Sequence, residues 1–151
     1  MGRWLCALSS FLFVSLLAPL VWAQVAEPET VLKAREAALT ARKLGALLGL
    51  FADDAVIVTS SGRLLTGKAQ IHIWVQDQID RSQREEAGLR QQQGSKLSWA
   101  GRVYRDDWQT LGISPLEVRQ DAIVRDGKIK FFNTTFTPES WAQLQAARAK
   151  N

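Results

Sequence analysis

The chain has 151 residues and a formal net charge of +4 at pH 7, from 19 basic and 15 acidic side chains. It contains one cysteine, Cys6, and one histidine, His72, so a disulfide framework and a metal site built from histidines are excluded. The basic residues are spread along the chain among acidic ones. This is not the charge pattern of a nucleic-acid-binding surface, and we expect no nucleic-acid partner.

The first 23 residues have the pattern of a secretory signal peptide. Arg3 supplies the positive start, Leu5–Ala18 is a largely apolar run, and Val21-Trp22-Ala23 has the short residues of a cleavage site. Pro19 ends the run before it reaches the roughly 20 residues that a membrane-spanning helix needs. We therefore expect a secreted or periplasmic protein with no stable membrane anchor after cleavage, in which residues 24–151 form one domain.

Cleavage after Ala23 gives a mature protein that begins at Gln24 and has lost Cys6. Sequencing the N-terminus of the exported protein is therefore expected to read Gln24-Val25-Ala26. A mature form that still carries the apolar run would contradict this prediction.

The rest of the chain alternates between helical and strand patterns. Apolar residues at helical spacing predict a helix with Val31, Leu32, Ala38 and Leu39 on one face. The other predicted helices lie at 44–51, at about 68–84, in one turn at 106–112, and after Thr137-Pro138, where Thr137 is the expected cap. Strands are predicted at 55–59, 64–66 and 97–104, whereas the polar segment 82–95 is expected to begin as helix and end as a loop.

The last two predicted strands, Leu116–Arg125 and Lys128–Thr137, flank Asp126-Gly127, a preferred sequence for a two-residue type I′ hairpin. Regular pairing from that turn places two sets of side chains on opposite faces. One set is apolar or neutral and is expected to face inward: Val118, Gln120, Ala122, Val124, Ile129, Phe131, Asn133 and Thr135. The other carries charges, which are costly to bury, and is expected to face outward: Glu117, Arg119, Asp121, Ile123, Lys130, Phe132, Thr134 and Phe136.

Three segments carry local motifs: Leu47–Val56, which contains Phe51-Ala52-Asp53-Asp54, then Leu65–Ile71, then Val124–Ile129. Their order and spacing resemble the SnoaL-like branch of the nuclear-transport-factor-2-like superfamily, over about residues 29–141. The resemblance implies an α+β fold in which three helices pack into a strongly curved, mostly antiparallel sheet, forming a cone with an internal pocket. The superfamily contains isomerases, cyclases, hydrolases, binding proteins and dimerisation modules, so the fold does not fix the function.

The catalytic residues of that superfamily have no clear counterpart here. The resemblance places the carboxylate base of a ketosteroid isomerase near Thr59, which cannot act as one. The only tyrosine, Tyr104, falls on a predicted strand, whereas the superfamily's catalytic tyrosine lies on the first helix. Arg119 and Asp121 are the only pair comparable to a cyclase or epoxide hydrolase site, and they are expected to face outward. Catalytic residues stay unassigned, and no cofactor or metal is expected.

We expect an apolar cone wall with a few neutral polar groups, a composition that suits a small, largely apolar ligand. The candidate pocket residues are Trp74, Trp99, Gln120, Phe131, Asn133 and Thr135. An exported small-molecule-binding protein is therefore the first hypothesis. The alternatives are a cyclase or isomerase acting on a polyketide- or steroid-like substrate, and a dimerising structural module with a filled cavity. His72 is expected at a solvated rim, and Trp108 at the entrance.

Two aromatic residues, Phe132 and Phe136, fall on the predicted outward face among charged neighbours. Rings on such a face are expected to be covered, because burying one fully contributes about 1.5–3 kcal/mol. We expect a homodimer in which a second copy covers them. The alternative is that the terminal helix carrying Trp141 covers the rings within one chain.

Overall fold

The structure is a computed structural model and describes residues 26–150, so the predicted signal peptide and its cleavage site lie outside the described residues. The helices are α1 (Pro28–Thr40), α2 (Leu44–Leu50), α3 (Gly67–Asp80), α4 (Asp106–Thr110) and α5 (Pro138–Arg148). The strands are β1 (Phe51–Val58), β2 (Leu64–Thr66), β3 (Arg84–Ala87), β4 (Gln91–Gln93), β5 (Lys96–Tyr104), β6 (Leu116–Arg125) and β7 (Lys128–Phe136).

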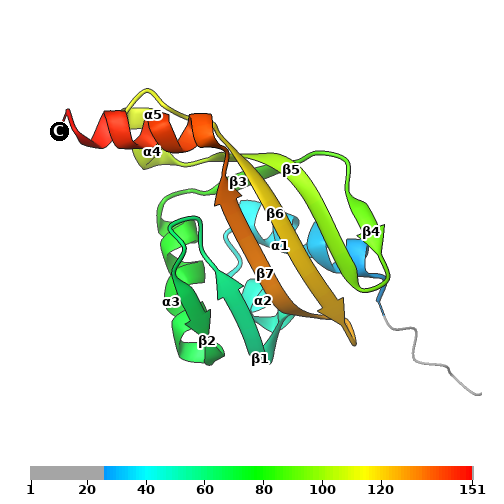
Figure 1. Cartoon of the computed structure of the whole chain (residues 1–151). Coiled ribbons are helices and arrows are strands. Elements are labelled where there is room, and N and C mark those ends of the chain that lie inside the picture. The colour runs from blue at the N-terminus through cyan, green and yellow to red at the C-terminus, as the bar shows by residue number, and fades with distance from the viewer. Residues whose placement is uncertain (1–25, 151) are drawn as a thin grey trace, which may run out of the picture.

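One curved, unclosed sheet organises the domain. Its strand order is β2-β1-β7-β6-β5-β3, and β4 pairs with the other half of β5. Every pairing is antiparallel except that of β1 with β7. Helices α1, α2 and α3 lie on one side of the sheet, whereas α4 and α5 lie together at one end of it (Figure 1). This α+β arrangement agrees with the predicted curved-sheet fold, but the described residues form five helices rather than three.

Helix α1 forms as predicted because its apolar residues repeat at helical spacing. Val31, Leu32, Ala38 and Leu39 are all buried and join the main core with residues of α2, α3 and the sheet. Their burial fixes α1 across the inner face of the sheet.

The polar segment after α3 departs from the prediction. Helix α3 ends at Asp80, because Arg81 caps it and Ser82 adopts a φ of 51° that a helix cannot continue through. The residues that follow form strands β3 and β4, which both pair with β5. The prediction of a helix that passes into a loop over residues 82–95 was therefore wrong. Because the segment is a strand, Glu85 lies on β3 and not on a helix.

The closing hairpin has the predicted turn but a different register. Asp126 and Gly127 have φ values of 53° and 69°, as a type I′ turn requires, and Val124 pairs with Ile129. A β-bulge then adds Lys130, so that Ile123 pairs with Phe131 and not with Lys130. One extra residue exchanges the two faces of the rest of β7.

The exchange reverses six side-chain predictions. Phe132, Thr134 and Phe136 share the inner face with Gln120, and Phe132 is fully buried. Phe131, Asn133 and Thr135 share the outer face with Asp121 and Arg119. The prediction that Phe132 and Phe136 form an outer aromatic surface was wrong, as was the inward placement of Phe131, Asn133 and Thr135.

A second hydrophobic cluster lies where α4 and α5 pack against one end of the sheet (Figure 1). Trp108 of α4 is buried there with Leu144 of α5 and Val118 of β6, which corrects its predicted place at the entrance. Thr137 caps α5 as predicted, by accepting a hydrogen bond from the Ser140 backbone nitrogen at 3.2 Å. Helix α5 then places Trp141 in a stacked contact with Phe136. None of the described helices is long and apolar enough to cross a membrane.

Candidate functional site

The interior of the cone holds a buried ion pair. Arg35 of α1 donates two hydrogen bonds to Glu85 of β3, from Nη1 to Oε2 at 2.8 Å and from Nη2 to Oε1 at 3.0 Å. Their side chains are only 2% and 3% exposed. The guanidinium carbon also lies 4.2 Å from the ring centroid of Phe132, within the range of a cation–π contact. The ion pair thus occupies the centre of the space between the helices and the sheet.

Neutral side chains complete this network. Gln120 of β6 donates from Nε2 to Glu85 Oε2 at 3.1 Å and to Thr134 Oγ1 at 3.3 Å, while its Oε1 accepts from Trp99 Nε1 at 2.8 Å. Gln83 donates to Glu85 Oε1 at 2.9 Å. Gln120 is therefore an inward-facing polar residue, as predicted, but its amide is engaged by other protein groups.

The Glu85 carboxylate is a weak proton acceptor in this setting. Burial alone would raise the pKa of Glu85. The charge of Arg35 and the hydrogen bonds from Arg35, Gln120 and Gln83 lower it by more than burial raises it, so the pKa lies below its ordinary value. Each carboxylate oxygen already accepts two hydrogen bonds. A general base needs a free lone pair and a pKa near the working pH, and Glu85 has neither.

A second arginine closes the cone beside Trp99. Arg90 follows β3, and its guanidinium carbon lies 5.2 Å from the Trp99 ring centroid. Its side chain is 7% exposed and forms ion pairs with Glu36 and, at 3.8 Å, with Glu29, both on α1. These contacts bind the loop between β3 and β4 to α1, so that Trp99 is 5% exposed.

Little space is left inside the cone. A cavity among Trp74, Gln78, Thr134 and Phe136 has a volume of about 40 Å³. Ligand pockets for drug-sized molecules are typically about 300–1,000 Å³. A cavity of this size has room for about one water molecule.

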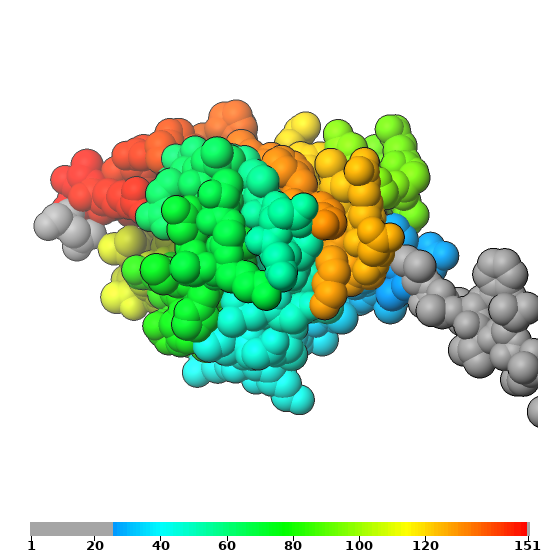
Figure 2. All heavy atoms as spheres, turned by 90° about the horizontal axis from the view of Figure 1, so that it is seen from below, coloured from blue at the N-terminus to red at the C-terminus, as the bar shows by residue number. Residues whose placement is uncertain are grey.

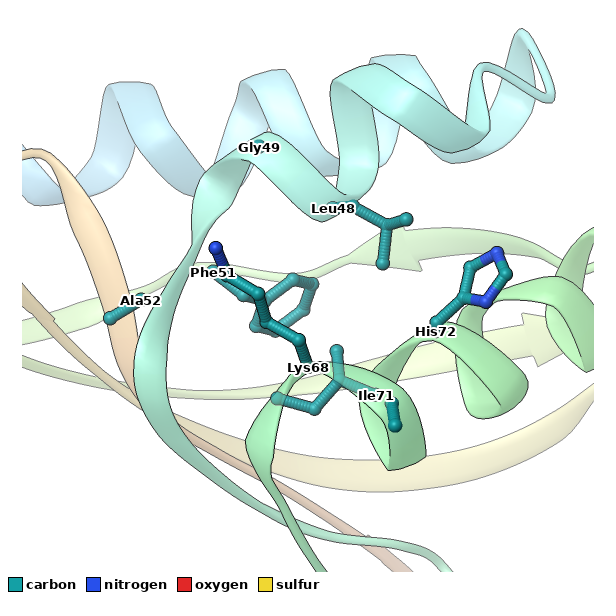
Figure 3. A pocket seen from close by; sticks show the side chains of 8 residues that line it. Leu48, Gly49, Phe51, Ala52, Lys68, Ile71 and His72 are labelled. Atoms are coloured by element: carbon teal, nitrogen blue, oxygen red, sulfur yellow. The ribbon is translucent and has the colours of Figure 1, made fainter.

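A much larger hollow lies outside the cone, between α2, the start of β1 and α3. We call it the α2–α3 groove; its volume is about 650 Å³, and its lining residues are Leu48, Gly49, Phe51, Ala52, Lys68, Ala69, Ile71 and His72. In Figure 3, Leu48 projects from α2 toward α3, while Lys68, Ile71 and His72 project from α3 toward it. Figure 2 views the molecule from the side on which α2 (cyan) and α3 (green) lie next to each other.

Charged side chains border one end of the groove. An adjoining hollow shares five of the lining residues and adds Asp53, Asp54, Lys128 and Lys130. Lys68 pairs with Asp53 and Lys130 pairs with Asp54, each at 2.8 Å. Hydrogen bonding to Lys130 is the main cause that lowers the pKa of Asp54. Apolar walls thus lead to a rim of paired charges, which we call the lysine rim.

Comparison with known proteins identifies the fold. No family model and no curated protein sequence matches the chain. Among solved structures, a protein of unknown function from Cytophaga hutchinsonii, described as similar to nuclear transport factor 2, has a TM-score of 0.62 and 9% identity; the match covers 77% of this chain and 95% of that one. A candidate polyketide cyclase from Sinorhizobium meliloti has a TM-score of 0.61 and 19% identity, over 73% of this chain and 100% of that one. A candidate ketosteroid isomerase from Kribbella flavida has a TM-score of 0.61 and 14% identity, over 73% and 77%.

The chain has the nuclear-transport-factor-2-like fold. The predicted resemblance to SnoaL-like proteins is therefore confirmed at the level of the fold. Identities this low do not extend the neighbours' activities to this chain.

Within the nuclear-transport-factor-2-like cone, the predicted pocket residues separate into two groups. Trp74, Trp99 and Gln120 lie inside, with Trp99 and Gln120 in the buried network. Phe131, Asn133 and Thr135 lie on the outer face, where Asn133 Nδ2 donates to Asp121 Oδ2 at 3.4 Å. A ligand-binding role for these six residues stays a prediction.

Several features of the site were not foreseen from the sequence. Arg35 and Glu85 were missed, although Arg35 lies on the apolar stripe of α1 between Leu32 and Leu39, where a charged residue signals a buried partner. His72 is exposed, as predicted, but it lines the α2–α3 groove, which the sequence did not indicate. The described residues contain no group of three or more acidic, cysteine or histidine side chains that could hold a metal ion.

Proposed function

We propose that this chain is an exported, non-catalytic binding protein that holds a small, largely apolar molecule in the α2–α3 groove. The observation that carries the proposal is the contrast between the two spaces. The cone centre is filled by the Arg35–Glu85 network, whereas the α2–α3 groove offers about 650 Å³ with mostly apolar walls. Burial of such walls against an apolar ligand supplies about 25 cal/mol per Å² of apolar surface removed from water.

The same contrast argues against a cyclase or isomerase on a polyketide- or steroid-like substrate. Such a substrate would need several hundred cubic ångströms beside a poised acid or base. The cavity in the cone measures about 40 Å³, and the carboxylate that lines it, Asp77, is paired with Arg81 at 2.7 Å. The buried carboxylate of Glu85 is fully engaged by Arg35 and two glutamines. A binding role therefore fits these residues better than catalysis.

Two glycines of α2 provide a matched test of the groove. A Cβ added at Gly49 or at Gly45 meets no atom within 4 Å, and both replacements remove a residue that weakens helices. Only Gly49 lines the groove. The neutral fluorophore N-phenyl-1-naphthylamine is expected to bind the wild-type protein, and Gly49→Phe is expected to weaken its binding at least tenfold by occupying the groove.

Gly45→Phe is the control and should bind the fluorophore as the wild type does. Fluorescence titration gives both affinities, and thermal unfolding confirms that both variants fold. The proposal fails if the wild-type protein does not bind the fluorophore, or if the two variants weaken binding equally.

We further propose that the protein is a homodimer, through an outer row of side chains that the corrected register defines. Val56 of β1, Phe131 of β7 and Ile123 of β6 are register partners on the outer face, and all three are half-buried within one chain. Arg119 and Asp121 lie beside this row, and their opposite charges can pair across a two-fold axis.

Phe131→Glu is expected to convert the dimer into a monomer, because it places a charge in the centre of the proposed contact. Light scattering at high micromolar concentration measures the mass. Arg125→Glu, at the exposed end of β6, is the control and should stay dimeric. A monomeric wild type, or a Phe131→Glu protein that is still a dimer, would contradict the proposal.

A further inference from the structure

The lysine rim indicates which chemical class of ligand the α2–α3 groove accepts. Its three ammonium groups, on Lys68, Lys128 and Lys130, are opposed by two carboxylates, on Asp53 and Asp54. Two of the lysines are each paired with one aspartate at 2.8 Å. The third, Lys128, donates its hydrogen bond to the backbone carbonyl oxygen of Gly49, which is neutral. One positive charge of the rim is therefore left without a carboxylate.

The excess charge lies at the end of the apolar walls. Leu48, Phe51 and Ala52 line both the groove and the hollow that contains the lysine rim. A molecule that fills the groove with an apolar chain therefore has its end beside the ammonium groups. Figure 3 shows Lys68 rising from α3 beside Phe51, so its ammonium group borders the apolar part of the groove.

Exposure allows the rim to rearrange around a ligand. The side chains of Lys68 and Asp53 are 75% and 81% exposed, and a pair this exposed contributes at most about 1 kcal/mol. An incoming anion can therefore replace Asp53 as the partner of Lys68 at little cost. An incoming cation would face three ammonium groups and gain contact only with aspartates that are already paired.

We propose that the α2–α3 groove binds single-chain amphiphiles with one anionic head group, such as a medium-chain carboxylate. The apolar chain lies along Leu48 and Ala69, above the buried Phe51, and the head group lies at Lys68 and Lys128. This inference rests on the proposed function and adds to it the charge of the ligand. It also predicts a salt dependence, because the head group is held by exposed charges that salt screens.

Three probes of the same chain length test the inference: dodecanoate, dodecanol and dodecylammonium. Each is measured by displacement of N-phenyl-1-naphthylamine, with the two charged probes below their micelle concentrations and dodecanol below its solubility limit. Dodecanoate is expected to bind about tenfold more tightly than dodecanol, and dodecylammonium the most weakly. In Lys68→Gln with Lys128→Gln, dodecanoate is expected to lose most of this advantage, since each exposed charge pair typically contributes a factor of about two to five. Dodecanol should bind the double variant and the wild type alike.

Lys96→Gln is the matched control, because Lys96 lies on β5 and does not line either hollow. Raising the salt concentration from 0.03 M to 0.5 M shortens the electrostatic screening length by about fourfold. This should weaken the binding of dodecanoate and leave the binding of dodecanol unchanged. The inference is overturned if dodecanol binds the wild type as tightly as dodecanoate does. It is also overturned if the Lys68→Gln, Lys128→Gln protein loses affinity for dodecanoate and dodecanol by the same factor. In either case the proposed apolar groove stands. If none of the probes displaces the fluorophore, the inference and the proposed function both fall.

Discussion

Glu85→Gln is expected to lower the free energy of unfolding by about 3–5 kcal/mol, because it leaves the buried Arg35 guanidinium without a counter-charge. Arg35 is 1% exposed and reaches no other described carboxylate within ion-pair distance. Its Nε has no hydrogen-bond partner, and its other side-chain hydrogen bond, from Nη2 to Gln78 Oε1, is long at 3.5 Å. Glu85 is therefore its main polar partner among the described residues. Urea unfolding at pH 7, followed by circular dichroism, measures the loss.

The paired variant Arg35→Met with Glu85→Leu is the control, because it removes both charges and keeps most of the volume. It is expected to be clearly more stable than Glu85→Gln alone.

The wild type should also lose stability in acid. The pKa of Glu85 is lower in the folded protein, so its contribution is complete above the unfolded value of about 4.3 and disappears as the pH falls through the folded value. A Glu85→Gln protein as stable as the wild type would show that the ion pair does not hold the cone together.

Phe132→Ala is expected to lower the free energy of unfolding by about 3–5 kcal/mol, the usual range for deleting a buried phenylalanine ring. Phe132 is fully buried and contacts Trp74, Trp99 and the Arg35 guanidinium. Phe131→Ala, one residue earlier and on the outer face, should cost only about 1 kcal/mol. Thermal and urea unfolding of the two variants, at a concentration where both are monomeric, provides the comparison.

This pair of variants tests the bulge at Lys130 directly. With regular pairing from the Asp126-Gly127 turn, Phe131 would face inward and Phe132 outward, and the order of the two effects would reverse. A larger loss for Phe131→Ala than for Phe132→Ala would therefore contradict the register described above.

In the closing hairpin, the sequence predicts the turn but not the register of the two strands. Its turn is specified by Asp126-Gly127, because few residue pairs tolerate two consecutive positive φ values. Its register is not specified by the turn, because β7 also pairs along its other edge with β1, a strand distant in the sequence. The one local sign is a break in alternation: Ile129, Phe131 and Phe132 are apolar and cannot all face one side of a regular strand.

The buried ion pair was beyond sequence prediction for a different reason. Arg35 could have been singled out, because it lies on the buried stripe of α1. Glu85 could not, since the segment that contains it is polar throughout and forms a strand only by pairing with β5. Tertiary pairing overrides local propensity in such edge strands. The filled cone, and hence the move of the candidate site to the α2–α3 groove, therefore appears only in the folded structure.

The most direct test of the central claim is to locate a bound apolar molecule by heteronuclear NMR. Dodecanol is titrated into the isotope-labelled protein, and the backbone amide and tryptophan indole shifts are followed. The account predicts that the largest shift changes fall in the groove, at Leu48, Ala52, Ile71 and His72, while the Trp99 indole N–H, hydrogen-bonded to Gln120, stays unchanged. Large changes at the Trp99 indole, Gln120 and Thr134, with none in the groove, would show that the cone opens to accept the ligand and would contradict the account.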